Sequence, residues 1–278
     1  MTEIRTITIG DTVVQVSGAG TPLVFVHGFT TTAEFWCEQV EAFSTRHQTI
    51  RINLPGHGRS PRPTDRSYTI EAFVEDVLGV YRALSIDSAV LVGLSMGGTV
   101  AQSFTLAYPE RVRALVLVGA TPHGLGADVN VDNVLKAIDD VGVVIASQNV
   151  IERSFGSAAS PGLVEFAKNE VAETPAFVAR QAIVSLNVSD TRARLGEIRV
   201  PTLVVVGEED IITPPNESQT LADGIPNSQL YSIPWAGHFP MLERPDVFNR
   251  LLGEFLLRQG MLPPRLTENA TSRVHQSV

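Results

Sequence analysis

The sequence has few features that would point to disulfides, nucleic acids or membranes. It contains one cysteine, Cys37, so no disulfide can form within the chain. A formal net charge of −9 argues against nucleic-acid binding, because phosphate recognition needs clustered cations. No apolar stretch approaches the ~20 residues of a membrane span, and no CxxC, HExxH or P-loop pattern occurs. With no basic-then-apolar leader at the N-terminus, these absences predict a cytoplasmic protein that uses no metal and no cofactor.

Apolar strand patterns alternate with helical patterns along much of the 278-residue chain. This alternation predicts an α/β fold, a mostly parallel sheet with helices on both faces. A hairpin over residues 4–16 is expected at the sheet edge. Further strands are expected at residues 22–26, 49–54, 89–92, 112–118, 201–206 and 229–233, and helices at 70–84, 99–108 and 247–256.

The pattern changes after residue 122, where short helical segments replace the strands. They lie around residues 131–144, 150–155, 161–173 and 175–188. We therefore predict a helical cap at residues 123–199, inserted into a core formed by residues 1–122 and 200–260. Residues 261–278 are polar and without apolar periodicity, so they are expected to form a mobile tail.

Residues 93–97 read GLSMG, a G-x-S-x-G motif between an apolar strand and a helical segment. This is the context of a nucleophile elbow, in which Ser95 lies on a sharp turn. The turn strains the serine backbone, and side chains larger than those of Gly93 and Gly97 would collide with the adjoining strand and helix. The motif alone is only moderately specific, so other parts of the chain must support it.

A serine nucleophile needs a base within hydrogen-bond reach and an acid that orients the base. His238 follows the last predicted strand, where sites of open α/β sheets gather, and is the predicted base. Residues 208–210, Glu-Glu-Asp, follow the strand at 201–206. Asp210 is the preferred acid and Glu209 the alternative. The order Ser95, Asp210, His238 is that expected of an α/β-hydrolase arrangement.

Attack on a carbonyl group creates an oxyanion, which needs N–H donors aimed at it. One donor is expected from Met96, directly after the nucleophile. The other is expected from Phe29, in the loop after the strand at 22–26, where Gly28 permits an unusual turn. The residues predicted to line the substrate pocket are Phe29, Trp36, His123 and Phe239.

These motifs together resemble an α/β-hydrolase-fold enzyme over about residues 3–258. The resemblance is carried by HGF at 27–29, PGHGRS at 55–60, GLSMGG at 93–98, YPERV at 108–112, the Asp210 loop and GH at 237–238. Within the superfamily the chain is most similar to small capped carboxylesterases, 3-oxoadipate enol-lactonases and cofactor-free perhydrolases. The resemblance implies Ser95, Asp210 and His238 as triad, with Phe29 and Met96 forming the oxyanion hole.

The activity implied by this resemblance is hydrolysis of a small-to-medium carboxylic ester or lactone through an acyl-enzyme. Ser95 stands where haloalkane dehalogenases and epoxide hydrolases have aspartate, which makes those activities unexpected. Phe239 follows the histidine where meta-cleavage C–C hydrolases usually carry tryptophan, so C–C cleavage is a weaker alternative. Perhydrolysis would use the same residues. A ligand receptor or signalling regulator of the same fold is the non-enzymatic alternative. The oligomeric state is left open.

Overall fold

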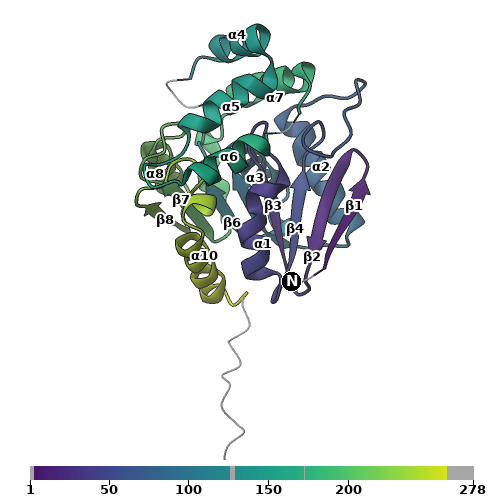
Figure 1. The fold of residues 1–278 in the computed structure, drawn as a ribbon. Helices are drawn as coiled ribbons and strands as arrows, with labels where there is room; N and C mark the ends of the chain where they lie inside the picture. The colour runs from purple at the N-terminus through teal and green to yellow at the C-terminus, as the bar shows by residue number, and fades with distance from the viewer. Residues whose placement is uncertain (1–2, 126–128, 172, 262–278) are drawn as a thin grey trace, which may run out of the picture.

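The computed structural model describes residues 3–125, 129–171 and 173–261, which form a central eight-stranded sheet with helices around it (Figure 1). The strand order is β1-β2-β4-β3-β5-β6-β7-β8. Strand β2 runs antiparallel to both of its neighbours, and all other pairs are parallel, as predicted. The strands are β1 Ile4–Ile9, β2 Thr12–Ser17, β3 Thr21–Val26, β4 His47–Asn53, β5 Ala89–Leu94, β6 Val112–Val118, β7 Thr202–Gly207 and β8 Ser228–Ile233.

Helices cover both faces of the sheet, which explains why the central strands are apolar along their whole length. In β5, Val90 and Val92 belong to the core on the side of α1 and α10. Leu91 belongs to the core on the opposite side, with α2, α3 and α8. The helices around the sheet are α1 Cys37–Phe43, α2 Ile70–Ala83, α3 Met96–Ala107, α8 Pro215–Gly224, α9 Pro240–Glu243 and α10 Pro245–Arg258, with the short 3-10 helices η1 Ala33–Trp36 and η2 Pro109–Arg111.

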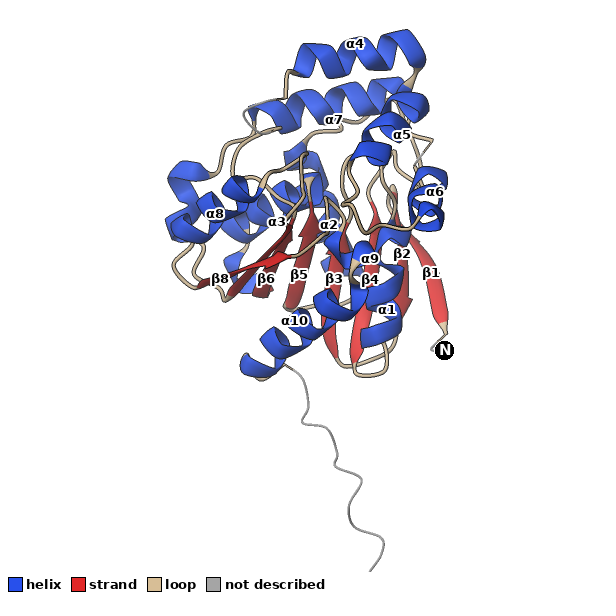
Figure 2. Ribbon diagram, turned by 60° about the vertical axis from the view of Figure 1, so that its left-hand side comes forward, coloured by secondary structure: helices blue, strands red, loops and turns tan. Residues whose placement is uncertain are grey.

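Four helices between β6 and β7 lie over the carboxyl ends of the strands, at the top of Figure 2. We call them the cap helices: α4 Val131–Val141, α5 Val143–Arg153, α6 Pro161–Asn169 and α7 Ala176–Val188. The chain enters and leaves this region side by side, because His123 pairs with Asp190 and the Thr191 N–H donates to the Pro122 carbonyl at 2.8 Å. The predicted boundary between cap and core at residue 199 stays a prediction. The 3-10 helix η3, Arg192–Glu197, lies before that boundary but packs against α8, a helix of the core.

Several element ends differ from the sequence expectations. The first expected cap segment continued to residue 144, but α4 ends at Val141 because Gly142 adopts a φ of 81° and α5 starts after it. Met261, the first residue of the predicted tail, is buried, and its N–H donates to the Leu256 carbonyl. Residues 262–278 of that tail lie outside the described residues. None of the described helices is long and apolar enough to cross a lipid bilayer.

Candidate active site

Ser95 lies between β5 and α3, on the sharp turn that the motif predicts. Its φ is 52°, a region that costs a residue other than glycine about 1–3 kcal/mol. The Ser95 N–H donates to the Val118 carbonyl at 2.9 Å, and the Ser95 carbonyl accepts the Gly98 N–H at 2.8 Å. These bonds hold the strained turn between β6 and the first turn of α3.

The glycines on either side of Ser95 have no room for a side chain. A Cβ atom on Gly93 would lie 2.2 Å from the Gly97 carbonyl oxygen. A Cβ atom on Gly97 would lie 2.4 Å from the carbonyl oxygen of Val26, in β3. The turn can therefore form only where both positions lack a Cβ, which is the steric requirement expected from the sequence.

We expect Gly97→Ala to lower the free energy of unfolding by about 1–3 kcal/mol, because β3 must move away from the added methyl group. Gly79→Ala is the matched control. Gly79 lies within α2, and a Cβ atom there would have nothing within 4 Å, so alanine should raise the free energy of unfolding by about 0.5–1 kcal/mol. Denaturant unfolding of the three proteins measures both effects. Equal stability of Gly97→Ala and the wild type would contradict close packing of the elbow on β3.

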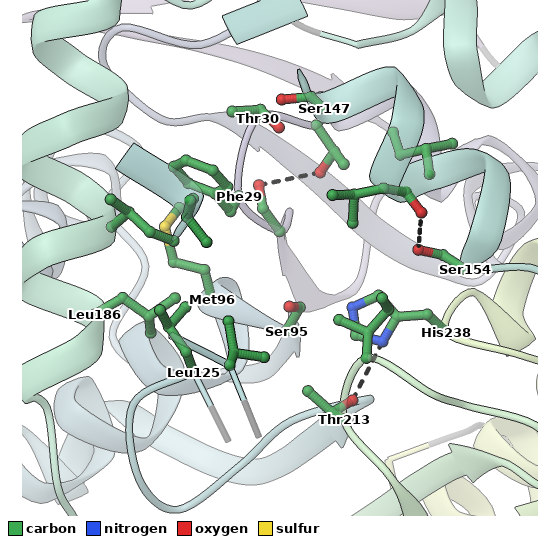
Figure 3. Close-up of a pocket in the computed structure, with 18 of the residues that line it drawn as sticks. Phe29, Thr30, Ser95, Met96, Leu125, Ser147, Ser154, Leu186, Thr213 and His238 are labelled. Carbon is green, nitrogen blue, oxygen red and sulfur yellow. Dashed lines mark hydrogen bonds between the residues drawn. The ribbon is translucent and has the colours of Figure 1, made fainter. Parts of the chain in front are cut away.

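The loop after β8 brings the imidazole of His238 beside Ser95 (Figure 3). Its Nδ1 lies 2.8 Å from Asp210 Oδ2 and 3.2 Å from Thr213 Oγ1. The other ring nitrogen, Nε2, faces Ser95 in Figure 3. A Cβ atom on Gly119 would lie 3.0 Å from Nδ1, so the ring packs directly against the main chain after β6. This orientation is the one that a general base for Ser95 requires.

Asp210 is buried in the loop after β7 and is held by hydrogen bonds to both carboxylate oxygens. Oδ1 accepts the N–H groups of Ile212 and Thr213, each at 2.9 Å, and Oδ2 accepts the Thr213 hydroxyl at 2.8 Å. Burial by itself raises the pKa of Asp210, but His238 and these hydrogen bonds outweigh burial and hold the pKa below its ordinary value. Asp210 is therefore an anion beside His238 at neutral pH.

Glu209, the alternative acid, points away from the imidazole. Its carboxylate accepts both the N–H and the hydroxyl of Ser157, in the segment after α5. The structure therefore brings Asp210, and not Glu209, to His238.

The loop after β3 lies against Ser95 from the other side. A Cβ atom on Gly28 would lie 3.3 Å from the Ser95 Cβ. Thr30 adopts a φ of 54°, and the Thr31 hydroxyl donates to the Gly28 carbonyl at 3.1 Å, which fixes the turn. Within the described part of the chain, the N–H groups of Phe29 and Met96 have no hydrogen-bond acceptor. Their assignment as oxyanion donors stays a prediction.

Two buried histidines, His27 and His57, lie next to the loop after β3. His27 Nδ1 lies 2.8 Å from the Gly28 carbonyl oxygen, and its Nε2 accepts the Leu54 N–H at 3.1 Å. The rings of His27 and His57 lie 5.1 Å apart. Burial lowers the pKa of His27 to about 3 and that of His57 to about 4. Both rings are therefore neutral at pH 7, and the His27 ring holds the Gly28 carbonyl of the loop.

A cavity of about 600 Å³ opens above Ser95, beneath the cap helices. The loop after β3, the elbow and the His238 loop form one side, and Phe29 and Phe239 lie there. The opposite side is mainly apolar and comes from the cap and the segments next to it: Leu125, Val134, Ile138, Ile151, Ile183 and Leu186. Such a lining favours apolar groups on the substrate. Across the described ranges, no cluster of three or more His, Cys, Asp or Glu side chains is arranged to hold a metal ion.

Two of the expected pocket residues lie elsewhere, and the structure corrects them. The Trp36 ring is fully buried, with its centroid 5.2 Å from that of Phe25 and 6.4 Å from that of Phe248. It packs into the core between the sheet and α10 because η1 turns it inward. His123 lies at the base of the cap, where its Nε2 is 3.0 Å from Glu217 Oε2 on α8.

Two contacts that the sequence did not predict hold His238 and Asp210 in place. Thr213 bonds to both Asp210 and His238, and its position three residues after the aspartate is typical of local side-chain hydrogen bonding. The carbonyl of Ser154, just after α5, accepts the His238 N–H at 2.6 Å. No sequence signal links these two positions, because they lie far apart in the chain.

The sheet order and the elbow after β5 define the class of protein, an α/β hydrolase. The sequence profile of the alpha/beta hydrolase fold family matches residues 21–137 and 161–245, and the chain belongs to this family. The predicted fold and the predicted family are both confirmed.

Relatives of this chain are hydrolases with different substrates. The 2-hydroxymuconate semialdehyde hydrolase of Pseudomonas sp. (strain CF600) is 31% identical over 255 residues, which cover 86% of this chain and 88% of that protein. The structure of a thermophilic esterase from Thermogutta terrifontis has 28% identity and a TM-score of 0.81, covering 92% of this chain and 99% of its own. Est816, described as an N-acyl homoserine lactone degrading enzyme, has 31% identity and a TM-score of 0.79, covering 90% and 100%. The general function is therefore that of a hydrolase.

Proposed function

We propose that this hydrolase cleaves a small-to-medium carboxylic ester or lactone through an acyl-enzyme formed on Ser95. The observation that carries the proposal is the convergence of Ser95, His238 and Asp210 at one side of a mainly apolar cavity. The similarity to an esterase and to a lactone-degrading enzyme supports the carboxylic ester class.

Acylation begins when His238 Nε2 removes the hydroxyl proton of Ser95 and Oγ attacks the carbonyl carbon. Asp210 holds the Nδ1 proton and stabilises the imidazolium that forms. The N–H groups of Phe29 and Met96 donate to the oxyanion of the tetrahedral intermediate. When the intermediate collapses, the C–O bond to the alcohol breaks and His238 delivers its proton to the departing oxygen.

Deacylation repeats these steps with water as the nucleophile. His238 removes a proton from water, the hydroxide attacks the acyl carbon, and Ser95 leaves with the proton returned by His238. With a lactone, the alcohol and the acid remain parts of a single product molecule. With peroxide in place of water, the same steps would give a peracid, so product analysis separates hydrolysis from perhydrolysis.

C–C cleavage is the second candidate, because the chain is 31% identical to a 2-hydroxymuconate semialdehyde hydrolase. The Phe239 and His238 rings pack edge to face, with centroids 5.1 Å apart. C–C hydrolases of the meta-cleavage type usually carry tryptophan at the position of Phe239, which makes this candidate the weaker one. A panel with p-nitrophenyl esters from acetate to octanoate, lactones and a meta-cleavage product compares the two activities. A ligand receptor of this fold would bind tightly without turnover of any of them.

Covalent trapping tests the proposed nucleophile directly. Incubation with a p-nitrophenyl phosphonate should release p-nitrophenol and leave one phosphonyl group on Ser95, because the reagent mimics the tetrahedral intermediate. Peptide mass spectrometry locates the group, and prior incubation with a good ester substrate should slow its attachment. Modification of another residue, with Ser95 unmodified, would contradict an acyl-enzyme on Ser95.

A further inference from the structure

A carboxylate outside the triad fixes the main chain on both sides of His238. Glu243 Oε1 accepts the Gly237 N–H at 2.9 Å and the Phe239 N–H at 3.1 Å. The N–H of His238 itself donates to the Ser154 carbonyl at 2.6 Å. Three consecutive N–H groups are thus bound, so the direction in which the His238 side chain leaves the backbone is fixed.

The same carboxylate also reaches the segment that follows α5. The Gly156 N–H donates to Glu243 Oε2 at 2.7 Å. A Cβ atom on Gly156 would lie 2.3 Å from the Trp235 carbonyl oxygen, and one on Gly237 would lie 2.2 Å from the Ser154 carbonyl oxygen. The segment at 154–156 and the loop carrying His238 therefore pack main chain against main chain, with Glu243 bonded to both.

We propose that Glu243 is a positioning residue for His238, and that it couples the placement of this base to the segment at the end of α5. The proposal rests on the proposed function only in taking His238 as the base. Glu243 does not touch the reacting atoms. It acts through the backbone, while Asp210 and Thr213 act on the ring at Nδ1.

The chemistry of the contact requires a carboxylate. An ionised carboxylate offers two acceptor oxygens and no donor, so it can bind three N–H groups, and charge strengthens each bond. Burial raises the pKa of Glu243 above its ordinary value, and the bonds from these N–H groups, which favour the anion, offset only part of that rise. An amide at the same place offers one acceptor oxygen and turns an NH₂ group toward an N–H donor. Glu243→Gln therefore leaves at least one main-chain N–H without its partner while the side-chain volume is kept.

Displacement of the main chain at Gly237 or Phe239 moves Nε2 relative to the Ser95 hydroxyl. A misplacement of about 1 Å between reacting groups can lower a rate about 10²-fold. We therefore expect Glu243→Gln to lower kcat on p-nitrophenyl acetate by about 10- to 100-fold. The matched control is Glu254→Gln, because Glu254 is an exposed glutamate on α10 whose ion pairs, among the residues that the structure describes, are with Arg250 and Arg258 of the same helix.

A readout that needs no substrate separates positioning from general folding. In the wild type, the proton between His238 Nδ1 and Asp210 Oδ2 should give a far-downfield proton NMR resonance. At a temperature well below unfolding of either protein, this resonance should shift or broaden in Glu243→Gln and stay unchanged in Glu254→Gln. The resonance is measured without substrate, so it tests the positioning role of Glu243 even if the protein does not hydrolyse esters.

Hydrogen exchange of the wild type provides a test that does not depend on whether the variant folds. The amides of Gly156, Gly237 and Phe239 lie in loops, yet they should exchange as slowly as the core amides of α10. Exchange at the rates of open loops would overturn the proposal. So would a folded Glu243→Gln variant with the wild-type resonance and the wild-type kcat.

Discussion

Ser95→Ala should lower kcat on p-nitrophenyl esters by about 10⁴–10⁶-fold. The reason is that the strained turn after β5 holds the Ser95 hydroxyl beside His238 and at the start of α3. The remaining rate should come from substrate binding and from the oxyanion donors, which the substitution leaves in place. Steady-state kinetics from acetate to octanoate measure the loss, and the chain-length optimum of the wild type reports the length of the cavity.

Ser147→Ala is the matched control for this experiment. Ser147 also lines the cavity, but it belongs to α5 in the cap and lies away from the His238 ring. It should retain most of the wild-type kcat. An active wild type in which Ser95→Ala loses less than about tenfold would exclude Ser95 as the nucleophile.

Asp210→Asn should lower kcat by about 10⁴-fold at neutral pH while the fold is retained. Two effects combine. An uncharged amide no longer stabilises the imidazolium, and its NH₂ group can donate to Nδ1, which places the ring proton on Nε2 where the base must accept. The buried Oδ1 bonds to Ile212 and Thr213 can be kept by the amide oxygen, so stability should change less than activity. Kinetics and thermal unfolding of the same preparation give both numbers.

Glu209→Gln decides between the two acids that adjoin each other in the sequence. Its carboxylate binds Ser157 and makes no contact with His238, so kcat should stay near the wild-type value. A larger loss of kcat in Glu209→Gln than in Asp210→Asn would assign the acid to Glu209 and overturn the geometry described above.

The strands and the sharp turn at Ser95 were predictable because local sequence determines them. The G-x-S-x-G turn can be recognised from five residues, and its steric requirement is the one found at Gly93 and Gly97. Apolar runs such as that of β5 identify strands buried on both faces.

Side-chain direction and contacts between distant segments were not predictable in this way. Trp36 follows the loop after β3 closely, but nothing in the sequence says that η1 turns its ring into the core instead of the cavity. The choice between Glu209 and Asp210 depends on which way a short loop turns after β7. The contacts of Glu243 could not be predicted from the sequence, because its partners Gly156 and Gly237 come together only when the segment after α5 packs on the core.

The close pairing of the two chain segments at the base of the cap has a consequence for engineering. Because Pro122 and Thr191 are hydrogen bonded, everything between them is a loop whose ends already meet, and its length can change at little cost in closure entropy. Helices from another hydrolase can therefore be joined there. Two parts of the region must be kept in any graft, because each is bonded to the rest of the molecule. One is the stretch from Ser154 to Ser157, which is bonded to the His238 loop and to Glu209. The other is α7, whose Gln181 and Ser185 side chains accept the N–H groups of Tyr68 and Ile70.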